Sequence, residues 1–81
     1  MLNQYGSKLA YSQNGEVLSV EDVVTYVDDG SKWVVVGIAE LAKWVRVSAT
    51  SLPGNRHRFF WPEALTIDKF LTAARKAQSN A

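Results

Sequence analysis

Three turn-forming dipeptides divide most of this chain into short segments that favour β-strands. Asn14-Gly15, Asp29-Gly30 and Pro53-Gly54 each lie between runs of β-branched, aliphatic or aromatic residues. Asn-Gly and Asp-Gly are the strongest short-range hairpin signals, because a type I′ turn needs positive φ at both central residues. The spacing therefore predicts consecutive hairpins, and consecutive hairpins build an antiparallel sheet.

The hairpin around Asp29-Gly30 has the clearest pattern. A tight turn there would place Tyr26 opposite Trp33, and Val24 opposite Val35 on the same face. The acidic start of segment 20–27 would also suit a helix, but its β-branched residues favour a strand. The other two signals predict a hairpin joining 9–12 to 17–20, and a longer loop joining strands 44–49 and 56–61.

The structure of segment 38–43 is left open by the sequence. Its good helix formers favour a single helical turn, and a loop is the alternative. The C-terminal segment is a predicted helix with Thr66 as N-cap and Asp68 in the first turn. Leu65 and Phe70 fit a hydrophobic staple around that cap. We expect the helix to cover the sheet with the apolar side chains of Ile67, Phe70, Leu71 and Ala74.

These elements predict an α+β fold: a small antiparallel sheet or SH3-like barrel built from hairpins, with a C-terminal amphipathic helix packed on it. Residues 1–81 are expected to form one domain, with frayed ends near 1–6 and 77–81. Hydrophobic residues make up 47% of the chain, which suffices for a core without disulfides.

The chain has no cysteine, which favours a cytoplasmic location and excludes thiolate metal sites. The N-terminus does not resemble a secretory signal, and the longest apolar stretch, 33–39, is far too short to cross a membrane. The single histidine, His57, lies between two arginines, where an imidazolium would be disfavoured. We therefore expect no metal, no cofactor and no enzymatic activity.

Charge is distributed unevenly along the chain, although the formal net charge is only +1. Residues 1–42 hold two bases and six acids, a net charge of −4, whereas residues 43–81 hold seven bases and two acids, a net charge of +5. Such an asymmetry indicates an anionic partner on the basic side, unless folding intermixes the two halves.

The basic half contains an aromatic-basic segment, Arg56 to Trp61. Phe59, Phe60 and Trp61 are interpreted as core residues. The cations support a small nucleic-acid-binding module that uses this hairpin; the predicted phosphate contacts are Lys43, Arg46, Arg56, His57 and Arg58. The alternative is a protein-interaction module, such as a regulator, an inhibitor or a homodimer, that binds through exposed Trp and Tyr side chains.

Overall fold

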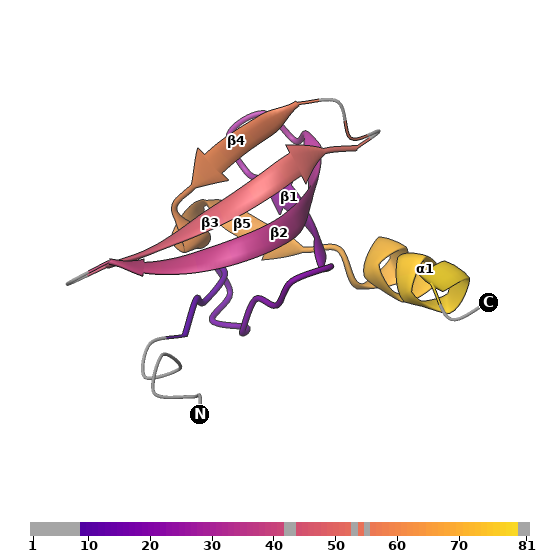
Figure 1. The fold of residues 1–81 in the computed structure, drawn as a ribbon, viewed down its shortest axis with the longest axis horizontal. Coiled ribbons are helices and arrows are strands. Elements are labelled where there is room, and N and C mark those ends of the chain that lie inside the picture. Colours follow the sequence, from indigo (N-terminus) through magenta and orange to yellow (C-terminus); the bar gives the residue numbers. More distant parts are fainter. Residues whose placement is uncertain (1–8, 42–43, 53, 55, 80–81) are drawn as a thin grey trace.

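The structure is a computed structural model that describes residues 9–41, 44–52, 54 and 56–79. Five antiparallel strands lie in the order β4-β3-β2-β1-β5 and are followed by one helix (Figure 1). The elements are β1 (Val23–Tyr26), β2 (Lys32–Leu41), β3 (Trp44–Ser51), β4 (His57–Phe60), the 3-10 turn η2 (Pro62–Ala64), β5 (Leu65–Ile67) and α1 (Lys69–Ser79). The predicted α+β class is confirmed; the sheet stays open and does not close into a barrel.

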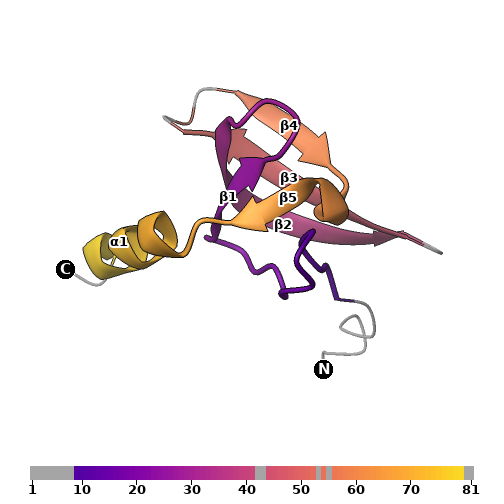
Figure 2. The ribbon, with the colours of Figure 1, turned by 180° about the vertical axis from the view of Figure 1, so that it is seen from behind.

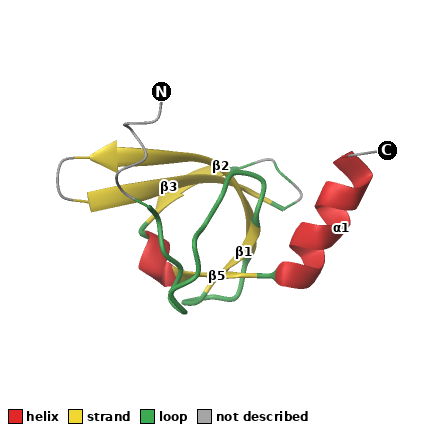
Figure 3. Ribbon diagram, turned by 90° about the horizontal axis from the view of Figure 1, so that it is seen from below, coloured by secondary structure: helices red, strands yellow, loops and turns green. Residues whose placement is uncertain are grey.

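The sheet curls around its core, as Figure 3 shows for β1, β2 and β5. β1 and β4 are not neighbours in the sheet, yet the ring centroids of Tyr26 and Phe60 lie 4.9 Å apart. The Trp33 ring also lies 4.9 Å from Phe60, at 70° to it. The buried residues on this concave side form the core: Ala10, Leu18, Val24, Trp33, Val35, Val47, Ala49, Phe60 and Leu65.

The N-terminal hairpin closes this core. The Ser12 N–H donates to the Glu16 carbonyl at 2.7 Å, and Gly15 has a φ of 82°, as a turn at Asn14-Gly15 requires. Instead of two strands, the segments pair at a single bridge between Tyr11 and Val17. A turn is therefore present at the predicted place, but it is not type I′, because Asn14 does not have a positive φ, and the ladder around it is shorter than expected.

The central hairpin is confirmed as two strands, so a helix over 20–27 is wrong, but its register differs by two residues from the prediction. Val24 pairs with Trp33, because residues 27–30 form a four-residue loop in which the Tyr26 N–H donates to the Ser31 carbonyl. Gly30 has the expected positive φ of 76°, whereas no other residue of this loop does. A shift of two residues keeps each side chain on its face, so the core pattern is preserved.

The ambiguous segment 38–43 is strand as far as Leu41, where β2 ends, and residues 42–43 lie outside the described residues. Long pairing with β3 explains why the helical propensity is overridden: Ile38 pairs with Val47, and this ladder runs on to Leu41. The predicted strands around the Pro53-Gly54 loop are present as β3 and β4. None of the helices in the described part of the chain has the length and apolar character needed to span a membrane.

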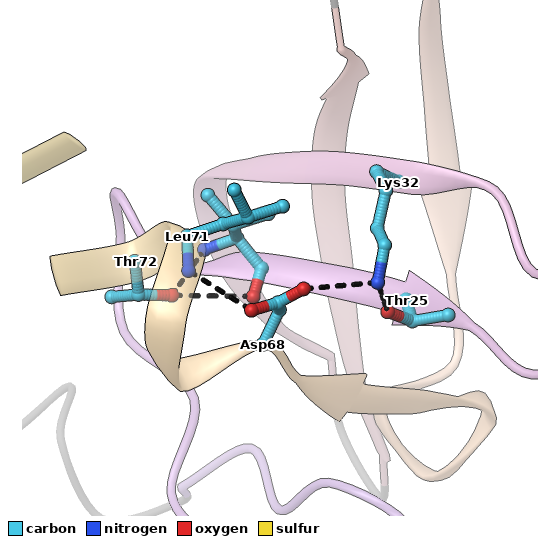
Figure 4. Close-up of polar contacts among 6 residues, drawn as sticks. Thr25, Lys32, Asp68, Leu71 and Thr72 are labelled. Carbon is cyan, nitrogen blue, oxygen red and sulfur yellow. Dashed lines mark hydrogen bonds and ion pairs between the residues drawn. The ribbon is translucent and has the colours of Figure 1, made fainter. Parts of the chain in front are cut away.

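Helix α1 begins differently from the prediction. Asp68 is the residue that caps the helix, since its Oδ1 accepts the Leu71 N–H at 2.9 Å (Figure 4). Thr66 instead belongs to β5 and pairs with Thr25. Phe70 is 82% exposed while Leu65 is fully buried, so the predicted staple is wrong.

The predicted packing stripe is also wrong at Phe70 and Ala74, which are both exposed. Thr72 is buried instead: its Oγ1 accepts the Val23 N–H at 2.8 Å and lies 3.3 Å from the Val23 carbonyl. The contact between Thr72 and Val23 fixes which side of α1 faces β1, so the side that carries Phe70 and Ala74 faces solvent. Figures 1 and 2 show the helix projecting past the end of the sheet, so α1 contacts β1 without covering a face.

Candidate nucleic-acid interface

Strands β3 and β4 expose one face away from the core. Val47 and Ala49 are fully buried, so the alternating residues of β3 point to the opposite side. On β4, Phe59 pairs with Ser48 and His57 pairs with Thr50, which places both β4 residues on that same side. We call this surface the outer face; its described members on the two strands are Arg46, Ser48, Thr50, His57 and Phe59.

Phe59 is the centre of the outer face. Its side chain is 51% exposed, and the Arg46 guanidinium carbon lies 4.1 Å from the ring centroid. The His57 ring stands at 90° to Phe59 with its centroid 5.0 Å away. A cation over an aromatic face is attracted by the ring quadrupole, by about 0.5–1 kcal/mol at an exposed site. The three side chains therefore form one exposed cluster that combines a guanidinium with two aromatic rings on a strand pair.

A hydrogen bond fixes the histidine within this group. Nε2 of His57 lies 2.6 Å from the Ser48 hydroxyl on the neighbouring strand. The imidazole is consequently held between a serine on β3 and the Phe59 ring on its own strand. Both neighbours are fixed by the sheet, so the exposed ring keeps its orientation.

The charge asymmetry between the two halves of the chain is largely neutralised by folding. The described ion pairs join Lys32 to Asp68, Lys69 to Glu16, Arg75 to Glu21 and Lys76 to Asp22. The cations of α1 thus face acids from the N-terminal half. Arg46, Arg56 and Arg58 form no ion pair with any described residue, and none of the outer-face positions on β3 and β4 is acidic.

Arg58 lies on the other side of β4. Its guanidinium carbon is 5.0 Å from the ring centroids of both Tyr26 and Phe60. The nearby loop carries Asp29, whose pKa is lowered by the Ser31 hydroxyl and N–H and, to a smaller extent, by the positive charges of Arg58 and Arg56. Arg58 and Arg56 therefore both lie within electrostatic reach of this carboxylate, which makes their surroundings less favourable for a phosphate.

The five predicted contact residues are thus separated. Arg46 and His57 share the outer face, whereas Arg58 lies on the opposite face. Arg56 is exposed at the start of β4, where its N–H donates to the Ser51 hydroxyl at 3.1 Å. Lys43 lies outside the described residues. Arg46 and Arg58 consequently do not converge on one surface.

The sequence predicted that Phe59, Phe60 and Trp61 are core residues. Only Phe60 is buried, with 5% of its surface exposed. Phe59 and Trp61 are 51% and 49% exposed, because alternation along β4 turns them away from the concave side. Phe59, Ser48 and Thr50 are the members of the outer face that sequence reasoning left out. The signal for Phe59 was its position two residues from His57 on one strand.

The described residues contain no group of three or more His, Asp or Glu side chains placed to hold a metal ion. The arrangement on the outer face suits the binding of an anionic, stackable ligand, since it combines an exposed ring with a guanidinium. No protein-family model matches this chain, and the searches of curated proteins and of solved structures likewise find no significant match.

Proposed function

We propose that this chain binds single-stranded nucleic acid on the outer face of β3 and β4. The observation that carries the proposal is the half-exposed Phe59 ring, which lies between the Arg46 guanidinium and the His57 ring. Exposed aromatic rings on a sheet stack with unpaired bases, and each such base contributes about 1–3 kcal/mol.

The guanidinium beside Phe59 supports a phosphate backbone next to the stacked base. Arg46 can bond phosphate oxygens or stack on a base with its planar guanidinium. Bases within a duplex are already stacked on one another, so an exposed ring on a strand surface favours a single strand, whose bases are free to stack on it. Arg58 and Asp29 on the other side of β4 lie outside the proposed surface.

The proposed role is that of a binding module and not of an enzyme, and its proposed location is the cytoplasm, where single-stranded RNA is abundant. Support for the proposal of a binding module is the composition of the outer face, which contains no carboxylate on β3 or β4 that could act as a general base beside His57 and Ser48. Support for the proposed location is the absence of cysteine from the chain.

Fluorescence anisotropy with a short labelled single strand tests this function, and a duplex of the same sequence serves as comparison. We expect the single strand to bind more tightly, and Phe59→Ala to weaken its binding by about five- to 150-fold, the equivalent of one stacked base. Phe70→Ala is the matched control, because it removes an even more exposed phenylalanine ring from α1, away from the outer face. Equal losses in the two variants, or tighter binding of the duplex, would refute the assignment.

A protein partner is the second candidate function, and one observation favours it. Phe70 on α1 is 82% exposed, and a large aromatic side chain that is so exposed is typical of a contact with another protein. A protein-binding function of this kind would involve α1 and leave the outer face free.

A further inference from the structure

Helix α1 exposes its apolar side to solvent. Phe70, Ala73, Ala74 and Ala77 are all exposed, and they recur at the spacing of one helix face. We call these four residues the apolar stripe. The side of α1 toward β1 carries the buried Thr72 and the half-buried Arg75 instead. Amphipathic helices ordinarily show the reverse arrangement, so the stripe lacks a covering surface among the described residues.

The orientation of α1 is held by contacts along its length. Thr72 bonds the backbone of Val23, and Asp68 both caps the helix and accepts a hydrogen bond from Lys32 at 3.0 Å (Figure 4). Further along, Arg75 and Lys76 reach Glu21 and Asp22, each at 3.6 Å. Rotation of the helix to bury the stripe on its own sheet would break these contacts, so none of the described residues can cover the stripe while α1 keeps this orientation.

The geometry points to a second copy of this chain, paired through α1 in an antiparallel helix dimer. The stripe is complementary to itself: one large ring lies at its N-terminal end, and alanines occupy its centre and its C-terminal end. When two such helices run antiparallel about a two-fold axis between positions 73 and 74, each Phe70 lies over the Ala77 of the partner copy. Bulky residues then meet small ones, which allows close packing.

Charges along the border of the stripe agree with this arrangement. Lys69 and Lys76 lie on the same border, and they pair within the chain with Glu16 at 2.6 Å and Asp22 at 3.6 Å. A two-fold axis brings equal borders together, so Lys69 and Glu16 of one copy face Lys76 and Asp22 of the other. Each pair is neutral, and the two helices can therefore approach without uncompensated positive charge.

The available area limits the strength of this dimer. Two Phe70 side chains supply about 300–500 Å² of buried surface, and the alanines with their borders add to it. The total lies at or below the roughly 1,200 Å² that marks the low end of specific interfaces. We therefore expect a dimer that forms at high protein concentration and dissociates on dilution. This inference does not depend on the proposed nucleic-acid binding.

Sedimentation velocity of the full chain, from micromolar to millimolar concentration, measures this association. We expect Phe70→Ala to raise the dimer dissociation constant by about tenfold or more, because a central aromatic side chain dominates such a contact. Phe59→Ala is the matched control and should leave the dimer unchanged. Circular dichroism verifies that both variants remain folded. A chain that stays monomeric at every concentration, or a dimer that Phe70→Ala leaves intact, overturns the proposal and leaves the stripe to a different protein or a membrane surface.

Disulfide cross-linking tests the antiparallel alignment, since the chain has no cysteine of its own. Ala74→Cys places a thiol next to the two-fold axis and should form a disulfide-linked dimer rapidly on oxidation. Ala77→Cys places the two thiols about 10 Å apart along the helix axis, too far for a disulfide, and should cross-link slowly. Equal rates for the two variants contradict the antiparallel pairing.

Discussion

Replacing Thr72 by valine is the most specific perturbation of the contact between α1 and the sheet. Valine keeps the shape of threonine but removes the hydroxyl, whose Oγ1 accepts the Val23 N–H at 2.8 Å within a buried site. Val23 is fully buried, so its N–H would be left without a partner. An unsatisfied buried donor costs about 1–3 kcal/mol, and we expect the free energy of unfolding to fall by about 2 kcal/mol.

Thermal unfolding followed by circular dichroism measures this loss. For a domain of this size, about 2 kcal/mol corresponds to a decrease in Tm of about 8–16 °C. Thr72→Ser is the control, because serine keeps the hydroxyl and loses only one methyl group, which should cost about 1 kcal/mol. If Thr72→Val were as stable as the wild type, or more stable than Thr72→Ser, the proposed anchoring of α1 by this hydrogen bond would be refuted.

Three further predictions concern stability. The pKa of Asp68 is lowered by hydrogen bonds from the Leu71 N–H and from Lys32. The ionised carboxylate therefore stabilises the fold above the unfolded pKa of about 4, and this stabilisation is lost as pH falls through the lowered folded pKa. Asp68→Asn should reduce Tm at neutral pH and flatten the dependence of Tm on acid pH, and an unchanged acid slope would contradict this. Gly30→Val should lower Tm, because a β-branched residue is strained at a φ of 76°, and Gly30→Asn, which tolerates that region, should lower it less. Phe70→Ala should change the free energy of unfolding of the monomer, measured in dilute protein by urea titration, by about 0.5 kcal/mol or less, whereas a loss of several kcal/mol would mean that the ring is buried.

The strand arrangement was largely predictable because turn residues and β-branched runs are local signals. Asn14-Gly15 and Asp29-Gly30 marked their turns correctly. The two-residue error in register at Trp33 arose because the loop length depends on hydrogen bonds of Tyr26 and Ser31, which the dipeptide alone does not specify. Segment 38–41 was missed as strand because pairing with β3 outweighs local helix propensity.

The helix and the site were harder to predict because their contacts join distant parts of the chain. Periodicity identified Phe70 and Ala74 as one helix face, but it could not tell whether that face meets the sheet. The answer depends on Thr72 and Val23, which are 49 residues apart. Neighbouring residues of a strand point to opposite faces, so Phe59 and Phe60 on β4 had to lie on different sides of the sheet. Because each face then carried one phenylalanine, the sequence did not indicate which of the two was buried.

The salt dependence of single-strand binding in two arginine variants tests the assignment of the outer face most directly. Arg46 and Arg58 carry the same charge and lie on opposite faces of adjacent strands. Each phosphate contact on a single strand contributes about 0.7 to the slope of log K against log salt concentration. We predict that Arg46→Ala weakens binding and reduces the slope by about 0.7, while Arg58→Ala leaves the slope unchanged. Equal slopes for the two variants, or no binding of wild-type protein at low salt, would contradict nucleic-acid binding by the outer face.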